Sequence, residues 1–222
     1  MKEPEHHTII GQFYEFAGNR DFPCAGARSA INRNQLQMTV AGHMACPHDD
    51  ASILAFLYDF IDGYRLSGKL FQSAGIIFQG PLTATGLVYE TLLWQRLQSL
   101  ADADDKNYGY DKRVSADPRS PGFSFSLKEE AFFIIFLHPA SERKARTFAH
   151  PVIIFNPHDQ FEKLKRTGQF ERFKNVTRHR DQLYSGSVNP MLDDYGYSSE
   201  ARQYSGNPHS ETWQCPLKKR NG

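Results

Sequence analysis

The hydrophobic residues of the chain follow two spacings, which predict strands and helices. Polar and apolar side chains alternate over residues 35–40, as in a half-buried strand, whereas apolar residues recur every three to four positions from Ile53 to Tyr64, as in an amphipathic helix. A second long helix is predicted from about Ala84 to Ala103. Short apolar runs bounded by turn formers or charges predict further strands at 74–80, 123–127, 131–137 and 151–155.

Two of these apolar runs predict a β-hairpin. Runs 123–127 and 131–137 are separated only by Lys128, Glu129 and Glu130, a short charged turn. Beyond 155 the chain is predicted to be helical to about residue 180 and irregular from about 181. Together the elements predict an α+β fold for residues 1–222: a single domain with a mostly antiparallel sheet of about five strands, covered by helices.

Composition limits the function classes. The 222 residues include 26 Lys and Arg against 25 Asp and Glu, a formal net charge of +1. A nearly neutral chain has no global field to recruit nucleic acid or an anionic membrane, so neither partner is expected. No apolar segment approaches the ~20 residues of a membrane helix, and the N-terminus lacks the apolar core of a signal peptide. We therefore expect a cytoplasmic protein, and three cysteines, too few and odd in number for a disulfide framework, agree with a reducing compartment.

Five segments of the chain together resemble one known family. They occur in the order found in that family and extend over roughly 22–216, nearly the whole chain. The chain resembles the YqcI/YcgG family, and within it the heme-dependent N-hydroxylases of the guanitoxin-biosynthesis type. The matching segments are "FPCAGARSA" at 22–30, "LWQRLQSLADAD" at 93–104, "FLHPASERKARTF" at 136–148, "VIIFNPHDQFEKLKRTGQF" at 152–170 and "GSVNPMLDDYGYSSEARQYSG" at 186–206.

This resemblance implies an enzyme that binds heme b. It would attach oxygen, from O2 or peroxide, to a nitrogen of a guanidine-bearing, arginine-like metabolite. No Gly-x-Gly-x-x-Gly motif follows a predicted strand, so the electrons would come from an external donor. Two other classes stay open: a heme-binding sensor or carrier without turnover, and a non-heme iron enzyme. A homo-oligomer stays open as well.

The segment "AFFIIFLHPASERKARTF", residues 131–148, contains the first candidate for the iron site. Its apolar run ends just before His138, and Arg143 and Arg146 follow. A heme needs an apolar slot, an axial ligand and partners for its two propionates. In the light of the resemblance we predict His138 as the iron ligand, with Arg143 and Arg146 binding the heme. The alternative is that His138 caps the strand end and the cations form a solvated turn.

Cys24 is the competing heme ligand. It precedes a predicted helix in segment 22–30, which we expect to pack against the core. A thiol at a helix N-terminus has a lowered pKa, and a thiolate ligand pushes electron density toward bound oxygen. The alternative is a small buried residue at the helix start. His43, His150 and His158, at or near predicted strand ends, are further candidates for the axial ligand.

A guanidinium substrate is cationic and planar, so its pocket should offer carboxylates and an aromatic face. The C-terminal, Gly-containing segment supplies both kinds of residue, and loops often carry sites. We predict substrate binding by Asp193, Asp194, Tyr197 and Glu200, with Glu142 as a further acid within reach. The alternative is a surface loop whose acids balance the basic residues of the preceding helix.

Overall fold

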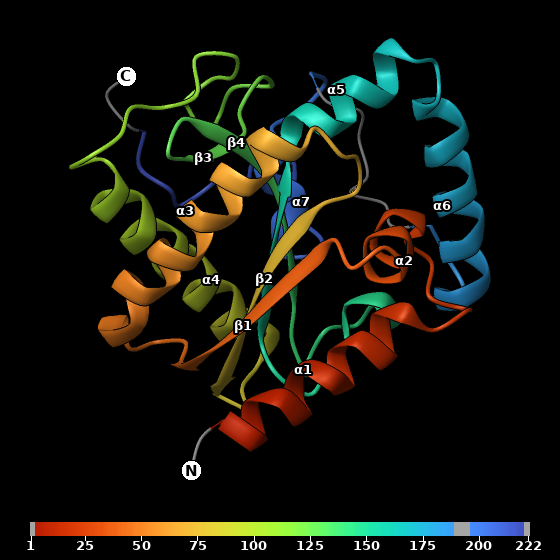
Figure 1. The fold of residues 1–222 in the computed structure, drawn as a ribbon, viewed down its shortest axis with the longest axis horizontal. Coiled ribbons are helices and arrows are strands. Elements are labelled where there is room, and N and C mark those ends of the chain that lie inside the picture. The colour runs from red at the N-terminus through yellow and green to blue at the C-terminus, as the bar shows by residue number, and fades with distance from the viewer. Residues whose placement is uncertain (1–2, 189–195, 220–222) are drawn as a thin grey trace.

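The computed structural model describes residues 3–188 and 196–219, and its centre is a five-stranded mixed sheet (Figure 1). The strand order is β1-β2-β5-β4-β3. The first two strands are parallel and all other pairs are antiparallel, which confirms a mostly antiparallel sheet in an α+β fold. The strands are β1 (Leu36–His43), β2 (Ser73–Gly80), β3 (Phe125–Leu127), β4 (Glu130–Leu137) and β5 (Val152–Pro157).

Helices cover both faces of the sheet (Figure 1). One face packs against α3 (Asp50–Ser67) and α4 (Gly86–Asp104), whose apolar residues form the larger core cluster with the sheet. The other face packs against α1 (Glu3–Gly18) and α2 (Ala25–Asn32), with α6 (Phe170–Ser185) beside α2. The remaining short elements are α5 (His158–Arg166), which follows β5 directly, α7 (Ala201–Tyr204), and the 3-10 turns Pro47–Asp49 and Lys144–Arg146.

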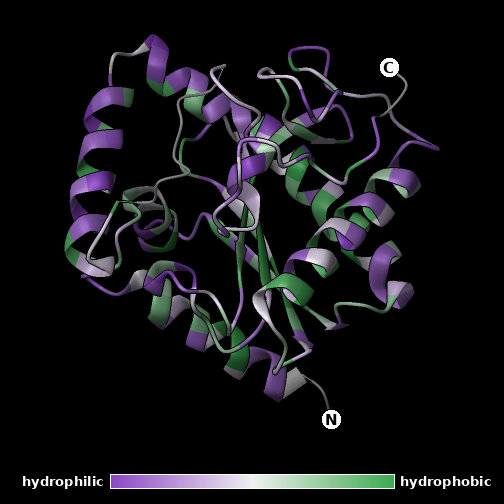
Figure 2. Ribbon diagram, turned by 180° about the vertical axis from the view of Figure 1, so that it is seen from behind, coloured by the Kyte–Doolittle hydropathy of each residue, from purple (hydrophilic) through white to green (hydrophobic). Residues whose placement is uncertain are grey.

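Strand β4 shows why the sheet residues are almost continuously apolar. Its side chains alternate, so Phe132 and Phe136 enter the α3–α4 core while Phe133 and Leu137 face the other helical layer. A strand buried on both faces needs apolar residues at nearly every position. Viewed from behind, the central strands are accordingly hydrophobic (Figure 2).

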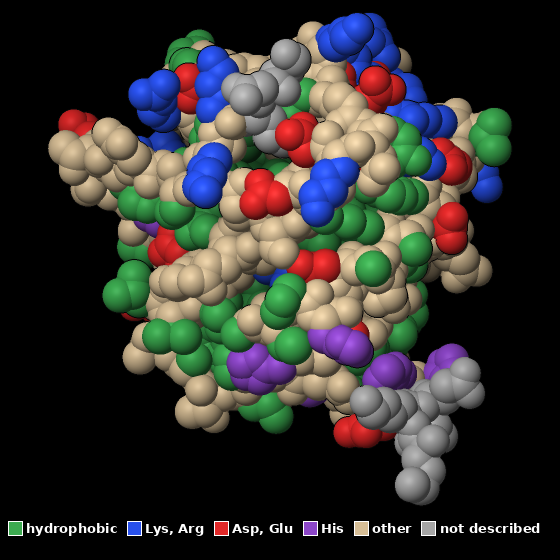
Figure 3. All heavy atoms as spheres, turned by 90° about the vertical axis from the view of Figure 1, so that its left-hand side faces the viewer, with side chains coloured by type: hydrophobic (Ala, Val, Ile, Leu, Met, Phe, Trp, Pro, Cys, Tyr) green, Lys and Arg blue, Asp and Glu red, His purple; other side chains and the backbone are tan. Residues whose placement is uncertain are grey.

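The outer surface of the α3–α4 layer is polar with scattered apolar side chains (Figure 3). Isolated apolar residues of this kind are normal on a protein surface. No helix in the described part of the chain is long and apolar enough to cross a membrane.

Three features of the fold either were not specified by the sequence-based expectation or differ from it. The strands β1 and β2 are parallel, because α3 forms a long crossover between them. Helix α1 was not predicted, although Ile9, Phe13 and Ala17 recur at helical spacing and are buried. Regular structure also continues past 181, since α6 ends at Ser185.

Segment 22–30 packs against the core, as predicted. Phe22 and Ala30 are buried in the second core cluster, beneath α1 and against the sheet. The helix expected after Pro23 is α2, with Cys24 as its N-cap residue. The segment therefore forms one wall of the helical layer that covers this face of the sheet.

A buried arginine joins α4 to the start of α3. The Arg96 side chain, on a residue 3% exposed, donates hydrogen bonds to the carbonyl oxygens of Met44 and Cys46 and forms an ion pair with Asp50. We expect Arg96→Met to lower the free energy of unfolding by about 3 kcal/mol or more, because Asp50 would be left as an uncompensated buried charge. Urea denaturation measures the change.

The control for this prediction is Arg119→Met. Arg119 forms an ion pair with Asp117 on the surface, where its side chain is 73% exposed. Exposed pairs contribute little, so this variant should unfold close to the wild type. Equal effects of the two substitutions would show that the Arg96 contact does not hold α3 and α4 together.

Candidate functional site

A cavity of about 310 Å³ lies between one face of the sheet and helices α1, α2, α5 and α6; we call it the apolar cavity. Its walls are mainly hydrophobic. The sheet contributes Phe133, Ile135 and Leu137 from β4 and Ile154 from β5. A volume of this size, with an apolar lining and a few polar groups, is typical of a small-molecule or cofactor site.

Cys24 lines the apolar cavity at the N-terminus of α2. Its Sγ accepts a hydrogen bond from the Ala27 backbone N–H at 3.4 Å. Burial raises the pKa of the thiol, while the N–H groups of Ala27 and Gly26 and the charge of Arg146 act in the opposite direction. The thiol is therefore neutral by itself, in surroundings where a bound metal ion would favour the thiolate.

Arg143, a predicted heme-binding residue, also lines the apolar cavity. Its Nη2 lies 2.5 Å from Asp181 Oδ2 and donates to the Ser187 carbonyl at 2.9 Å. Lys165 from α5 and both Lys174 and Arg178 from α6 add further cations to the lining. Basic side chains thus accompany the apolar walls on the side of α5 and α6.

Arg146 is the second predicted heme-binding residue, and it is 8% exposed. It lines the cavity and donates to the backbone carbonyls of Phe136, Gln203 and Tyr204 at 3.0 to 3.1 Å. Burial lowers its pKa to about 10, helped by the charge of Arg143, so the guanidinium stays cationic at neutral pH. Its observed contacts make Arg146 a structural tie between β4 and α7.

Glu200, one of the predicted substrate-binding residues, lies in the lining of the apolar cavity and is 3% exposed. Its Oε1 accepts hydrogen bonds from Ser124 Oγ at 2.6 Å and from the Tyr204 hydroxyl at 2.5 Å. Burial raises the pKa of this carboxyl group to about 8, although both hydrogen bonds and the charge of Lys165 lower it. Glu200 is therefore mainly protonated at neutral pH.

His158, the first residue of α5, lies beside Glu200 in the cavity lining. Its Nδ1 is 3.9 Å from Glu200 Oε2, and its Nε2 is 3.7 Å from Glu162 Oε1. Burial lowers the pKa of the imidazole, against the influence of Glu162. A neutral imidazole and a neutral carboxylic acid thus lie close together, and such a pair can hold and pass a proton.

His138 lies on the opposite face of the sheet. It follows Phe136 in the alternation of β4 and is 1% exposed, and its ring stacks on Tyr89 with centroids 4.7 Å apart. Burial and the charge of Arg146 lower its pKa to about 4. Neither ring nitrogen has a hydrogen-bond partner among the described residues.

The structure therefore does not bring His138 together with the cavity residues Cys24 and Arg143. The sequence showed that a buried strand ends at His138. It did not show which face of that strand would line the cavity. His138 as an iron ligand stays a prediction.

None of the other predicted substrate-binding residues within the described ranges lines the apolar cavity. Asp193 and Asp194 fall outside the described residues, and Tyr197 is 83% exposed. Glu142 is also exposed. Of the remaining candidate ligands, His43 is exposed at the end of β1 and His150 is half-buried before β5, and neither lines the apolar cavity.

Sequence reasoning named Glu200 and His158 separately and missed that they form a pair. Of the partners that hold Glu200, Tyr204 belongs to the C-terminal segment that was expected to supply the aromatic face of the pocket, and it lies four residues after Glu200, one helical turn away. Ser124 was not predicted as a site residue. Ser124 gave no local signal, because its contact with this carboxyl group joins residues 76 positions apart in the sequence.

We expect Glu200 to make stability fall as pH rises. Its pKa is about 8 in the folded protein against an ordinary value of 4.5, so between these values the folded state binds more protons than the unfolded state. Glu200→Gln should remove this contribution. The stability of the wild type relative to the variant should then fall by up to about 1.4 kcal/mol per pH unit within this window. Urea denaturation at about pH 5, 6.5 and 8 measures it, and parallel curves would contradict it.

Comparisons with known proteins place the chain in a family. It matches the model of the YqcI/YcgG family over residues 13–218. It is also 28% identical over 208 residues to the uncharacterized protein YqcI of Bacillus subtilis (strain 168), a match that covers 89% of this chain and 81% of that protein. No solved structure matches the chain. Because the family match spans nearly the full length, the chain belongs to the YqcI/YcgG family.

Proposed function

We propose that the chain is a heme-dependent N-hydroxylase that acts on a guanidine-bearing, arginine-like metabolite. One observation carries this proposal: Cys24 at a helix N-terminus and the buried His158 and Glu200 pair all line one apolar cavity. The segments that resemble guanitoxin-type N-hydroxylases support it from the sequence side. They include the residues around Cys24, His158 and Glu200.

The residues of the apolar cavity fit the requirements of a heme. A heme needs an apolar slot, at least one protein ligand and hydrogen-bonding partners for its propionates. The apolar cavity offers hydrophobic walls from the sheet and from α1, α2, α5 and α6. Among its polar lining residues, Cys24 and His158 can ligate iron, and Arg143 and Lys174 can pair with propionates.

Of the residues that can ligate iron, we assign Cys24 as the axial ligand. Its Sγ lies at the N-terminus of α2. Burial raises the pKa of the thiol, but the N–H groups of Gly26 and Ala27 and the charge of Arg146 act against this rise and would stabilise a thiolate bound to iron. A thiolate ligand favours cleavage of the O–O bond. His158 is the weaker candidate because its ring is positioned between Glu162 and Glu200.

Glu200 and His158 serve the substrate in this proposal. A guanidinium group that enters the cavity needs a carboxylate, and Glu200 Oε2 lies near His158 while Oε1 holds Ser124 and Tyr204. The His158 ring can accept the proton that Glu200 releases when the cation binds. These side chains would orient the guanidine, and the apolar walls would exclude water.

A bound heme would supply oxygen activation and transfer of one oxygen atom to the substrate nitrogen. The overall reaction with O2 consumes two electrons and two protons and releases water. The electrons would come from an external donor, or peroxide would replace both O2 and the electrons.

A heme carrier without turnover is the second candidate, because the same cavity could hold heme for transport or sensing. Turnover separates the two: reduced, heme-loaded protein is given O2 and L-arginine, and the product is analysed by mass for one added oxygen atom. A non-heme iron enzyme would use a facial triad of two histidines and a carboxylate. Within residues 3–188 and 196–219, no three His, Cys, Asp or Glu side chains form a metal-binding group, whereas a heme needs only one or two protein ligands.

The ligand assignment predicts a spectroscopic change. We expect Cys24→Ser to shift the Soret band and lower heme content, because the variant loses the thiolate ligand. The protein is expressed with a heme precursor and examined by absorption spectroscopy and a pyridine hemochrome assay. Cys46→Ser is the matched control, since Cys46 is an exposed free thiol and is not part of the cavity lining.

His138→Gln in the same series tests the assignment made from the sequence. A changed Soret band in His138→Gln, with an unchanged one in Cys24→Ser, would return the ligand role to His138. Failure of the wild type to take up any heme would refute both the enzyme and the carrier proposals.

Substrate recognition by Glu200 predicts a loss of affinity for guanidinium ligands. Glu200→Gln should weaken binding of L-arginine by about 1.5–3 kcal/mol, the contribution of a charged hydrogen bond, and leave heme content unchanged. Calorimetric titration measures it. Glu142→Gln is the control, because Glu142 is exposed and is not among the residues that line the cavity. Normal binding by Glu200→Gln would contradict the role of Glu200.

A further inference from the structure

A second cavity, of about 350 Å³, lies on the other side of α5; we call it the polar cavity. It is bounded by the C-terminal end of α3, the β3–β4 turn, α5 and Arg113 from the loop before β3. Helix α5 contributes to both spaces: Asp159 and Lys163 line the polar cavity, and Leu164 lines the apolar one. The polar cavity plays no part in the proposed heme chemistry.

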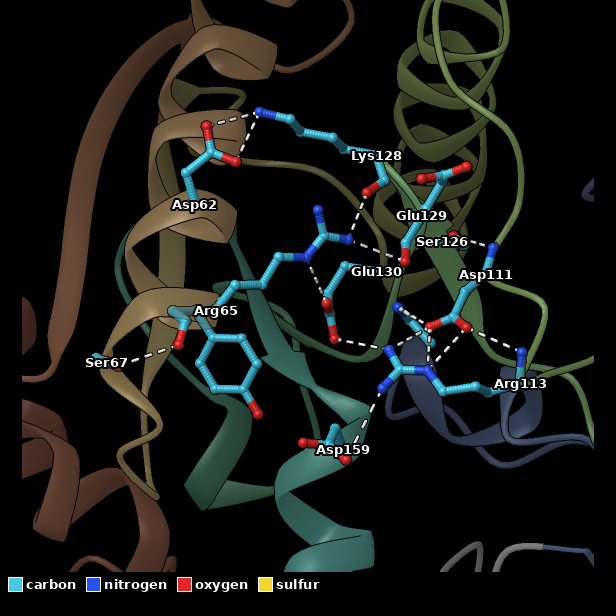
Figure 4. A network of polar contacts seen from close by, with 12 residues as sticks. Asp62, Arg65, Ser67, Asp111, Arg113, Ser126, Lys128, Glu129, Glu130 and Asp159 are labelled. Carbon is cyan, nitrogen blue, oxygen red and sulfur yellow. Dashed lines mark hydrogen bonds and ion pairs between the residues drawn. The ribbon is translucent and has the colours of Figure 1, made fainter.

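Two guanidinium groups converge on one carboxylate at this cavity (Figure 4). Glu130, whose side chain is 5% exposed, accepts from Arg65 Nε at 3.1 Å on Oε2 and from Arg113 Nη2 at 3.0 Å on Oε1. Asp159 is similarly engaged, by Lys163 Nζ at 2.8 Å and by Arg113 Nη1 at 3.8 Å. The carboxylates that face the cavity are thus already paired with cations.

The groups that still have hydrogen-bonding capacity are donors. Arg113 Nη1 lies beyond hydrogen-bonding distance of Asp159, and Lys163 Nζ has three N–H groups and one carboxylate partner. The clearest case is Tyr64, which lines the cavity and is 4% exposed: its hydroxyl has no hydrogen-bond partner among the described residues. Burial raises the pKa of this phenol, so it remains a donor.

A third acid, Glu129, also borders this cavity, but its carboxylate is not directed at the donors described above. Glu129 is exposed, and its carboxylate points away from the two guanidinium groups (Figure 4). Its backbone carbonyl instead accepts a hydrogen bond from Arg65 Nη2 at 3.0 Å. The three cations of the lining are balanced by Glu129, Glu130 and Asp159, and Arg113 also pairs with Asp111 at 2.6 Å. Unused donors, rather than net charge, therefore distinguish the space between Arg113, Lys163 and Tyr64.

We propose that the polar cavity binds a small oxyanion, a carboxylate or a phosphate, through Tyr64, Arg113 and Lys163. An oxyanion supplies the acceptors that these donors lack, and guanidinium groups bind carboxylate and phosphate oxygens with good geometry. An unpaired buried hydroxyl is unfavourable by itself, and an anion within reach would satisfy it. This proposal is independent of the heme proposal.

The test uses the full-length chain at constant ionic strength. Inorganic phosphate and acetate are titrated separately by calorimetry, with chloride as the background anion. We expect saturable binding of at least one of them. Tyr64→Phe should weaken it about tenfold or more, because the variant keeps the packed ring and loses only the donor. Lys163→Gln should weaken it to a similar degree.

Lys106→Gln is the matched control, because Lys106 is exposed and does not line the cavity. It removes the same charge as Lys163→Gln and should leave binding unchanged. Binding of phosphate alone would assign a phosphate ligand, binding of acetate alone would assign a carboxylate, and binding of both would show that the site accepts either oxyanion. No saturable binding of either anion, or binding that both Tyr64→Phe and Lys163→Gln leave unchanged, would overturn the proposal and leave the polar cavity as a structural ion-pair network.

Discussion

The buried guanidinium of Arg146 holds the C-terminal segment against the end of the sheet. It donates to the carbonyl of Phe136 in β4 and to the carbonyls of Gln203 and Tyr204 in α7. Glu200 lies one helical turn before Tyr204, so the same contacts also hold Glu200 in place. Among the described residues of the C-terminal segment, Glu200 is the only acid that lines the apolar cavity. The charge of Arg146 also favours the thiolate of Cys24. One residue thus supports both the walls and the electrostatics of the site.

The strands and most helices were predictable because they depend on local spacing. The runs at 131–137 and 151–155 have lengths and boundaries that nearly coincide with β4 and β5. The site was less predictable, because it depends on which face of β4 carries the cavity. Leu137 faces the cavity and its neighbour His138 faces α4. Alternation shows that the two side chains lie on opposite faces of the sheet, but it cannot show which face carries the cavity. Likewise, the contact of His158 with Glu200 joins distant segments, and only the assembled sheet brings them together.

Helix α5 separates two chemically different spaces with very few residues. Its first residue, His158, and the apolar Leu164 face the cavity that we assign to heme, while Asp159 and Lys163 face the polar cavity. The helix begins directly after β5, the central strand of the sheet, so its start is fixed by a strand that is paired on both sides. A change in the position of α5 would alter both spaces together, and ligands in the two cavities would then influence each other through this helix.

The neutral pair of Glu200 and His158 has a consequence for the charge balance of the cavity. A cation that binds at Glu200 requires the carboxylate, so the carboxyl group must lose its proton when the ligand enters. If His158 does not retain that proton, the proton passes to the solvent. Binding is then an exchange in which the cationic ligand enters the cavity and a proton leaves it. The heat of such binding contains the ionisation enthalpy of the buffer, and a rise in pH acts on the equilibrium as a rise in ligand concentration would.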